Sequence, residues 1–236
     1  MNPAFSIIIP AHNEENYIAK TLHSIKSQSY QDFEVIVVSN GSSDKTEGIV
    51  WKKISEKLMG GKLKQIILSQ PSVSSARNCG AKEARGELLL FLDADTTLEP
   101  ETLQKIKSQF SEGMAVATTK VKPDLDKKKF KFAMNFKNFY HTIGLYQGCS
   151  GALVCRKADF DKVGGYDPNL KVKEHRKLII QLKRECGGFE CLDAYVTTSM
   201  RRFSQWGLAK ATWFWVKQWA KNYTGNLEES EYEKIR

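Results

Sequence analysis

Residues 86–95, Gly-Glu-Leu-Leu-Leu-Phe-Leu-Asp-Ala-Asp, constrain the fold of this chain more than any other stretch. Five consecutive large apolar residues, 88–92, are typical of a strand that is buried on both faces in the middle of a parallel sheet. Two carboxylates, Asp93 and Asp95, follow directly, with one small residue between them. In open α/β sheets, ligands bind outside the carboxyl ends of the strands. The stretch therefore predicts an acidic binding site at the end of a central strand.

The chemistry of the two acids favours a metal ion. Alternation along an extended chain would point both carboxylates the same way. Two hard oxygen ligands at a strand end suit Mg²⁺ or Mn²⁺, shared with a substrate that carries phosphate. The simpler interpretation is that the acids are solvated in a surface turn and cap the helix that begins near Pro100. An isolated Asp-x-Asp pattern does not decide between the two interpretations, so the rest of the chain must.

Apolar strands alternate with helices over the first 110 residues. The predicted strands are 5–10, 34–38, 64–68 and 88–92. Amphipathic segments separate them, and Asn13 is the expected N-cap of the first helix. This alternation predicts a parallel, Rossmann-like sheet with right-handed crossovers. The polar turns after these strands would then leave one edge of the sheet and surround a single cleft.

The character of the sequence changes near residue 120. We expect strands at 115–121, 152–155 and 195–199, and helices at 158–163 and 173–185. Residues 127–146 are basic and dense in aromatic side chains. The tail 206–223 holds six large aromatics among three lysines: Trp206, Trp213, Phe214, Trp215, Trp219 and Tyr223. Such a tail either packs on the domain or lies in a membrane interface, with its lysines on anionic head groups.

Composition narrows the classes of partner and of compartment. The 236 residues include 36 Lys and Arg against 27 Asp and Glu, and the formal net charge of +9 favours an anionic partner such as a nucleotide, a lipid head group or a nucleic acid. We expect no signal peptide, because no basic n-region precedes the first strand. No apolar run reaches ~18 residues, so we expect no membrane span. The five cysteines include no Cys-x-x-Cys pair, which favours reduced thiols in the cytosol over a zinc site built from the last four.

An ordered set of motifs from about residue 5 to residue 202 resembles the family 2 glycosyltransferases of the GT-A fold. The motifs are Ile-Ile-Ile-Pro-Ala-His-Asn-Glu-Glu (7–15), Val-Ser-Asn-Gly-Ser-Ser-Asp-Lys-Thr (38–46), Ser-Ala-Arg-Asn-Cys-Gly (75–80), Phe-Leu-Asp-Ala-Asp (91–95), Gly-Cys-Ser-Gly-Ala-Leu-Val-Cys-Arg-Lys (148–157) and Val-Gly-Gly-Tyr-Asp (163–167). The family moves a sugar from a nucleotide donor, usually a UDP- or GDP-sugar, to an acceptor with inversion at the anomeric carbon.

The resemblance implies a mostly parallel, Rossmann-like α/β sheet flanked by helices. It divides the chain into a nucleotide-sugar-binding half (1–120), an acceptor-binding half (121–203) and an aromatic, basic helical tail (204–236). It also implies the residues that bind the nucleotide-sugar: Pro10, Ala11, Asn13, Glu14, Asn40, Arg77, Asp93, Arg201 and Arg202.

Individual roles also follow from the resemblance. Asp95 is the implied metal ligand and a catalytic residue, and Asp93 lies near the ribose and is the second candidate ligand. A Mn²⁺ or Mg²⁺ ion there would stabilise the charge that develops on the leaving nucleoside diphosphate. Arg77 lies near the diphosphate. Asn40 stands where the family usually has a base-binding Asp, and its amide can still hydrogen-bond to a base edge.

The sequence departs from the family where the catalytic base is expected. The family normally carries Glu-Asp before the helix that follows 163–167, and that Asp deprotonates an acceptor hydroxyl; here the pair is Glu174-His175. Either residue is a candidate base, since an imidazole titrates near neutral pH. Alternatively the acceptor is a phosphate, which is already ionised and which the four cations in 171–177 would attract. The plainest interpretation is a solvated basic helix start with an idle histidine.

The resemblance, taken with these patterns, implies a metal-dependent, inverting glycosyltransferase that works at the cytoplasmic face of a membrane. Its expected partners are a nucleotide-sugar donor, a saccharide or polyprenyl-phosphate acceptor, and a membrane surface contacted by 206–223, with no nucleic acid. Two alternatives belong to other classes. One is a non-enzymatic binder of membranes or anions, and the other is a dehalogenase-type phosphatase, whose Asp-x-Asp-x-Thr pattern matches 93–97 only superficially.

Overall fold

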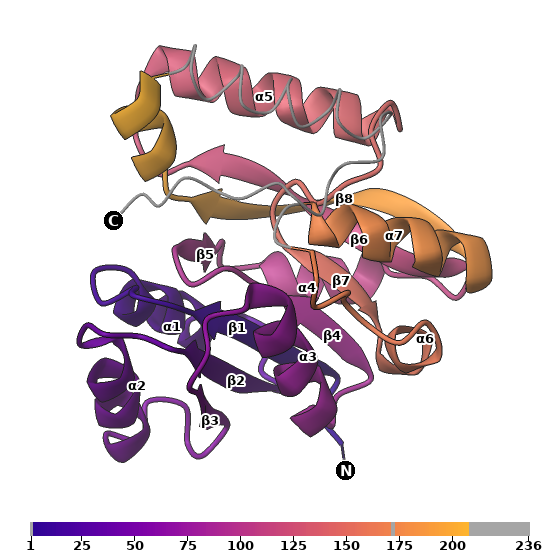
Figure 1. Ribbon diagram of the computed structural model, residues 1–236. Helices are drawn as coiled ribbons and strands as arrows, with labels where there is room; N and C mark the ends of the chain where they lie inside the picture. The colour runs from indigo at the N-terminus through magenta and orange to yellow at the C-terminus, as the bar shows by residue number, and fades with distance from the viewer. Residues whose placement is uncertain (1, 171–172, 208–236) are drawn as a thin grey trace.

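The computed structural model describes residues 2–170 and 173–207, and the first half of its sheet consists of four parallel strands (Figure 1). They are β1 (Phe5–Ala11), β2 (Phe33–Asn40), β3 (Leu63–Leu68) and β4 (Leu88–Phe91), in the order β3-β2-β1-β4. Every residue of β1, β2 and β4 is buried, as expected for apolar runs covered on both faces. The predicted parallel, Rossmann-like half is confirmed.

The second half extends the same sheet with mixed strand directions. Strand β7 (Leu153–Arg156) pairs antiparallel with β4, and β6 (Met114–Pro123) pairs antiparallel with β7. Strand β8 (Gly188–Thr198) runs parallel to β6, and β5 (Thr96–Leu98) pairs antiparallel with β8 at the edge. Since β6 runs through residue 120, the change in sequence character there falls inside a strand of one continuous sheet.

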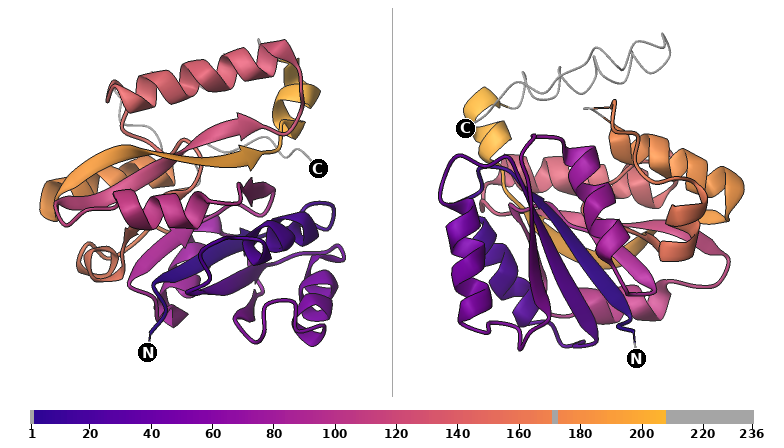
Figure 2. Two further views of the ribbon diagram at one scale, coloured as in Figure 1. Left: turned by 180° about the vertical axis from the view of Figure 1, so that it is seen from behind. Right: turned by 60° about the horizontal axis from the view of Figure 1, so that its bottom comes forward.

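Helices α1 to α7 cover the two faces of the sheet (Figure 2). One core cluster includes side chains of α1 (Ile18–Lys26), α2 (Thr46–Ser55), α4 (Thr102–Gln109) and α5 (Lys128–Thr142). The other includes side chains of α3 (Val73–Glu83), α6 (Lys157–Lys162) and α7 (Glu174–Glu185). Alternate residues of the strands supply the two clusters, so Ile7 and Ile9 pack on one side and Ile8 on the other. The arrangement is a three-layer α/β/α domain.

Close backbone contact fixes β4 against β1. A Cβ at Gly86 would lie 2.6 Å from backbone atoms of Phe5 and of Ser6, so only glycine fits at the entrance of β4. The Gly86 amide donates to Ser6 Oγ at 2.8 Å, and that hydroxyl donates to Glu34 Oε1 at 2.8 Å. These bonds join β1, β2 and the segment before β4, and so position the turn that follows β4.

The prediction that Asn13 caps the first helix is wrong. Helix α1 begins at Ile18, and Asn13 adopts a left-handed backbone with φ of 54°. Its side-chain oxygen instead accepts a hydrogen bond of 2.7 Å from the Ser43 amide in the turn after β2. An asparagine tolerates this conformation, and here it joins two neighbouring strand-end turns.

The C-terminal tail is described only at its start. Residues 201–207 are helical. Of the segment 206–223 that we predicted to contact a membrane, Trp206 lies in this helix, and the other five aromatic residues, from 213 to 223, lie outside the described residues. Among the helices that the structure describes, none has the length and the apolar character needed to cross a membrane.

Candidate active site

A cleft of about 1540 Å³ opens where the parallel strands end. The turns after β1, β2 and β4 and the start of α3 form one side of it, as predicted. The other side is formed by α5, the segment 145–151, the start of α7 and residues 198–203. Acidic groups gather at the strand ends, whereas lysines gather on the opposite side.

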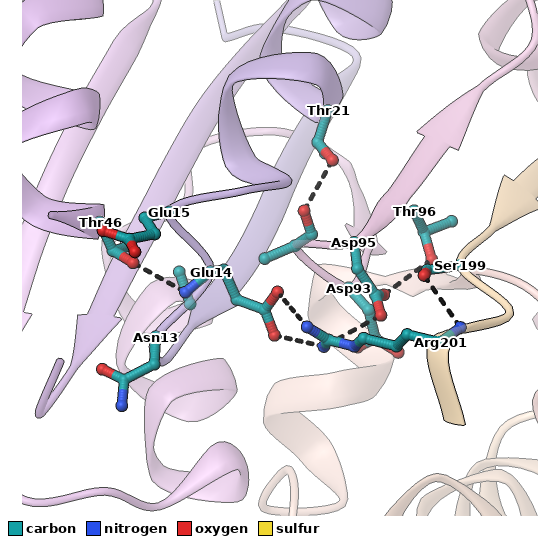
Figure 3. Close-up of polar contacts among 12 residues, drawn as sticks. Asn13, Glu14, Glu15, Thr21, Thr46, Asp93, Asp95, Thr96, Ser199 and Arg201 are labelled. Atoms are coloured by element: carbon teal, nitrogen blue, oxygen red, sulfur yellow. Dashed lines mark hydrogen bonds and ion pairs between the residues drawn. The ribbon is translucent and has the colours of Figure 1, made fainter. Parts of the chain in front are cut away.

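Backbone amides of the turn after β1 donate to side-chain oxygens of the turn after β2. The Glu14 amide donates to Thr46 Oγ1 at 2.7 Å, and the Glu15 amide donates to Asp44 Oδ2 at 3.1 Å. Asp44 also accepts from the Thr46 amide at 2.9 Å, as expected for Asp at the start of a helix. These bonds fix the backbone beside Glu14, whose carboxylate lines the cleft (Figure 3).

Asn40 lies at the end of β2, and its side chain is 4% exposed. Its Oδ1 accepts a hydrogen bond of 2.8 Å from the amide of Ser72, the residue that caps α3 through its own hydroxyl. The Asn40 carbonyl oxygen lies 2.6 Å from His12 Nδ1. The residue therefore couples the turn after β2 to the start of α3, while it also lines the cleft.

Arg201 lies between two acids at the strand ends (Figure 3). Its guanidinium makes a two-point contact with Glu14, at 2.9 and 2.5 Å, and lies 3.0 Å from Asp95 Oδ2. It also stacks over the Tyr17 ring at 4.8 Å. Burial raises the pKa of Asp95 to about 6, and the neighbouring Arg201 opposes that rise. One cation is thus shared by two carboxylates.

Arg77 makes a second cluster of the same kind. It is 3% exposed and donates to Glu174 Oε1 at 2.8 Å and to Asp93 Oδ1 at 2.9 Å. The guanidinium also lies 5.3 Å from the centre of the Tyr166 ring. Glu174 is buried, with a side chain 7% exposed, whereas the Asp93 side chain is 56% exposed. Arg77 is therefore anchored by the buried Glu174 and in turn holds the exposed Asp93 at the cleft.

His175 lines the cleft, but its ring is already engaged. Its Nδ1 lies 2.8 Å from the hydroxyl of Tyr166, in hydrogen-bond contact. Burial lowers the pKa of His175 well below its usual range, and the positive charges of Arg77 and Lys137 lower it further. The imidazole is consequently neutral at physiological pH and a weak base.

Cations line the side of the cleft opposite the strand ends. We use the term cationic wall for Lys128, Lys129, Lys137 and Lys173, all of which line the cleft. Lys137 donates to the Ser150 carbonyl at 2.7 Å, and burial lowers its pKa. Burial and the nearby Arg176 lower the pKa of Lys173 to about 8. The lowered pKa values of Lys137 and Lys173 mean that an anion bound beside these two ammonium groups would stabilise their charged form.

The structure brings together ten of the predicted site residues: Pro10, Glu14, Asn40, Arg77, Asp93, Asp95, Glu174, His175, Arg201 and Arg202 all line the cleft. Ala11 and Asn13 are not among the lining residues, since Ala11 is fully buried in β1 and Asn13 bonds to Ser43. Sequence reasoning missed Lys137, which lines the cleft from α5. A lysine in a basic stretch resembles a surface residue, so no sequence signal separates it from its neighbours.

The strand-end acids fit a divalent cation that is shared with a substrate. Within the described residues, no group of three or more His, Cys, Asp or Glu side chains could hold a metal by itself. Mg²⁺-type sites commonly use one or two carboxylates and complete their coordination with water and substrate phosphate. Asp95 and the exposed Asp93 match that donor set, although they lie on a turn after β4 and not on the extended strand from which we predicted their common direction. The five cysteines are free thiols.

Comparison with known proteins gives a family and several relatives. Residues 6–204 match the model of the family described as glycosyl transferase family 2. The chain is 35% identical over 114 residues to "Glycosyltransferase GlyA" of Streptococcus pneumoniae, and this match covers 47% of this chain and 16% of that protein. It is 38% identical over 102 residues to "Poly(ribitol-phosphate) beta-N-acetylglucosaminyltransferase TarS" of Staphylococcus aureus, covering 42% of this chain and 18% of that protein. It is 29% identical over 186 residues to an uncharacterized glycosyltransferase of Rickettsia prowazekii, covering 72% of this chain and 55% of that protein.

Solved structures agree on the fold. The structure of S. aureus TarS 1-349 in complex with UDP-GlcNAc matches with a TM-score of 0.64 and 26% identity, over 84% of this chain and 58% of that one. The mannosyltransferase PcManGT from Pyrobaculum calidifontis, solved with GDP-Man and Mn²⁺, matches with a TM-score of 0.68 and 16% identity, over 84% of this chain and 57% of that one. The predicted GT-A fold is confirmed. This chain spans between about a sixth and just over half of the length of the relatives named above.

Proposed function

The chain belongs to glycosyltransferase family 2, and from that premise we propose that it transfers a sugar from a UDP- or GDP-sugar to a lipid-linked phosphate, with inversion at the anomeric carbon. Family membership favours an enzyme over the non-enzymatic binder considered from the sequence. The observation that carries the choice of acceptor is the cationic wall, which faces the strand-end acids across one cleft.

On the donor side, the proposal uses the strand-end turns. The resemblance implies that Pro10 and Asn40 contact the base and ribose; both line the cleft, and Asn40 accepts a hydrogen bond from the Ser72 amide. A relative of 26% identity, TarS 1-349, has been solved in complex with UDP-GlcNAc, which supports a nucleotide-sugar donor. Arg201 and Arg77 both lie in contact with the acids that border the proposed diphosphate, and a bound divalent cation would supply the net positive charge there.

Asp95 and Asp93 would hold Mn²⁺ or Mg²⁺ together with the diphosphate, and the bound ion would neutralise the charge that develops on the leaving nucleoside diphosphate. The protein then holds the two carboxylates in place, and substrate oxygens would complete the coordination of the ion. Arg77 holds Asp93 at 2.9 Å, and Arg201 lies 3.0 Å from Asp95. Metal dependence is therefore part of the proposal.

On the acceptor side, a phosphate needs no general base. Its anionic oxygen attacks the anomeric carbon, the bond from that carbon to the nucleoside diphosphate breaks, and the electron pair leaves with the diphosphate. The products are a sugar phosphate linked to the lipid and a nucleoside diphosphate. Both candidate bases are engaged elsewhere, because Glu174 pairs with Arg77 and His175 contacts Tyr166. Lys173 and Lys137 supply the charge that attracts the acceptor.

A saccharide hydroxyl acceptor is the second candidate, since His175 and Glu174 both line the cleft. General-base catalysis typically contributes ~10²–10⁴-fold, so losing the true base would cost about that much. We expect His175→Ala to keep kcat with polyprenyl phosphate within ~10-fold of wild type, and Lys173→Glu to raise the acceptor KM. The assay measures kcat against pH with polyprenyl phosphate and with simple saccharides. A ~10³-fold loss in His175→Ala, together with disappearance of an acidic-limb pKa, would make His175 the base and refute the phosphate acceptor.

The donor is identified by thermal stabilisation, because a ligand that binds the native state raises its stability. UDP- and GDP-sugars are screened with and without Mn²⁺. A lipid-linked acceptor also implies a site of action at the cytoplasmic face of a membrane, and this location belongs to the proposal.

A further inference from the structure

Helix α5 exposes an apolar stripe on its outer surface. Phe132, Phe136, Phe139 and Ile143 are 75, 60, 60 and 50% exposed, and Leu145, just beyond the helix, is 76% exposed. The first four are spaced by four, three and four residues, which puts them on one face of a helix. The buried residues of α5 are Phe130, Met134, Asn138 and His141, on the opposite face. We call the five exposed side chains the α5 stripe.

The α5 stripe concentrates the exposed apolar surface of the molecule. Among the described residues, nine large hydrophobic side chains are exposed, and five of them form this stripe. Single exposed hydrophobic residues are ordinary, but a contiguous patch marks a contact with a membrane, a protein or a ligand. Figure 1 shows α5 at the top of the molecule, beyond β6 and β8 and at the opposite end from β1, β2 and β3. The stripe is therefore open to a large partner.

Positive charge borders the α5 stripe at its N-terminal end. Lys128 and Lys129 precede Phe132 by four and three residues, so they continue the same helical face by one turn. Both are exposed, as is Lys127 at the start of the helix. The acidic residue directly before these lysines, Asp126, pairs with Lys131 at 2.6 Å. Aromatic side chains flanked by lysines are the composition of a surface that binds an anionic lipid interface.

The α5 stripe is continuous with the cleft. Phe132, Phe136 and Leu145 line the cleft as well as the outer surface, and so do Lys128 and Lys129. A lipid whose chain lies against the stripe would therefore have its phosphate beside the cationic wall. This continuity connects the outer surface to the chemistry of the site.

We propose that the α5 stripe and its lysines dock this protein on an anionic lipid surface, with the cleft opening toward the lipid. The inference rests on the proposed function only for the identity of the acceptor. Two other occupants are conceivable: the segment 208–236 and a second copy of the chain. Residues 208–236 include five basic and four acidic residues, so that segment brings no net negative charge to the lysines of α5, whereas anionic lipid would neutralise them.

The test uses the full chain and flotation with vesicles of phosphatidylcholine alone or mixed equally with phosphatidylglycerol. We compare wild type with Phe139→Glu/Ile143→Glu, whose two residues belong to the stripe but do not line the cleft. The matched control is Trp51→Glu/Ile67→Glu, an aromatic and an isoleucine that are 57 and 55% exposed on α2 and β3. Donor hydrolysis in solution, thermal unfolding and gel filtration are measured for all three proteins.

We expect wild type and the control to bind the anionic vesicles and the stripe variant to bind at least ~10-fold more weakly, because it loses inserted apolar groups and adds charges that the surface repels. Raised salt should weaken wild-type binding. The stripe variant should keep its donor hydrolysis and its Tm. If donor hydrolysis is absent from every protein while vesicle binding follows this pattern, the proposed function fails and the docking surface stands.

Three results would overturn the docking surface. Equal vesicle binding by the stripe variant and by wild type would mean that another segment holds the lipid. A lower Tm in the stripe variant than in the control would mean that the stripe is covered by part of the chain. Elution of wild type as a dimer that the stripe variant abolishes would make a second copy the occupant.

Discussion

Replacing Glu174 by alanine tests whether this carboxylate anchors Arg77 or acts as a base. The two side chains are 7 and 3% exposed and lie 2.8 Å apart. At 2.8 Å and an effective dielectric constant of about 20, two unit charges attract by about 6 kcal/mol, and desolvation offsets much of that. Removing one partner of a buried pair typically costs about 3–5 kcal/mol, because the other charge stays buried. Arg77 keeps Asp93 at 2.9 Å, so we expect the lower end, about 3 kcal/mol.

Urea unfolding of four single variants and one double variant measures this free energy. Glu174→Gln should cost less, about 1–2 kcal/mol, since its amide oxygen still accepts a hydrogen bond from Arg77. A double-mutant cycle with Arg77→Met isolates the coupling between the two side chains. The matched control is Glu185→Ala on the same helix, because Glu185 pairs with the exposed Arg184 at 2.6 Å. An exposed pair of that kind should contribute at most about 1 kcal/mol.

Two results would show that Glu174 does not act mainly as an anchor for Arg77. If Glu174→Ala lowers the free energy of unfolding by less than ~1 kcal/mol, the pair does not stabilise the fold as its burial indicates. If the same variant loses ~10²–10⁴-fold in kcat while its acceptor binding persists, Glu174 is the base. A loss of stability with a modest loss in kcat supports the anchor.

Three further predictions concern two residues that line the cleft, Asp95 and Asn40, and Gly86 at the entrance of β4. Asp95→Ala should abolish Mn²⁺-dependent donor hydrolysis and leave the circular dichroism spectrum unchanged, since the residue lies on a turn; substantial activity in Mn²⁺ would remove Asp95 from the metal site. Asn40→Asp should keep activity and shift the preference between UDP- and GDP-sugars, because a carboxylate still accepts from the Ser72 amide, and unchanged kcat/KM for every donor would argue against a role in binding the base. Gly86→Ala should destabilise the protein by at least ~1–3 kcal/mol in urea, because its Cβ would meet β1 backbone, whereas Gly113→Ala, with nothing within 4 Å, should not; equal costs would contradict the packing argument.

The parallel half of the fold follows from local patterns, and the rest does not. The strands β1 to β4 are apolar runs separated by amphipathic segments, so periodicity and length identify them. Strand β5 has three residues and pairs with β8 about a hundred positions later, and such a strand has no local signal. We predicted β8 only at 195–199, yet it begins at Gly188. It includes Gly188, which pairs with Met114, and Asp193, which lies where the register with β6 shifts; intrinsic propensity disfavours both residue types in strands.

Helix α5 shows why a basic, aromatic stretch resists prediction. Its buried face and the α5 stripe both carry large apolar side chains, so the helical period of apolar residues is obscured. Sequence analysis recognised the aromatic density of 127–146 but could not separate core from surface. Only the position of the sheet against one face shows which phenylalanines are buried.

The candidate site was predictable as residues and not as contacts. Motif order brought Glu14, Asp95 and Arg201 into one set, but Arg201 is 187 positions from Glu14, and nothing local predicts the ion pair between them. The same holds for Arg77 and Glu174, which are 97 positions apart. The second pairing matters, because it shows that Glu174, one candidate base, already has a partner. His175, the other candidate base, has one in Tyr166.

The distribution of charge across the cleft bears directly on the choice of acceptor. Each of two arginines is shared by two acids, Arg201 by Glu14 and Asp95 and Arg77 by Asp93 and Glu174, so each group of three side chains holds two acids and one arginine. Carboxylate oxygens in such groups can bind a divalent cation. The opposite side carries the four lysines of the cationic wall, together with Glu174 and His175 at the start of α7. Burial of a lysine lowers its pKa and costs stability, and an anion beside it offsets part of that cost. A phosphate acceptor would add such an anion beside Lys137 and Lys173, whereas a neutral hydroxyl would not.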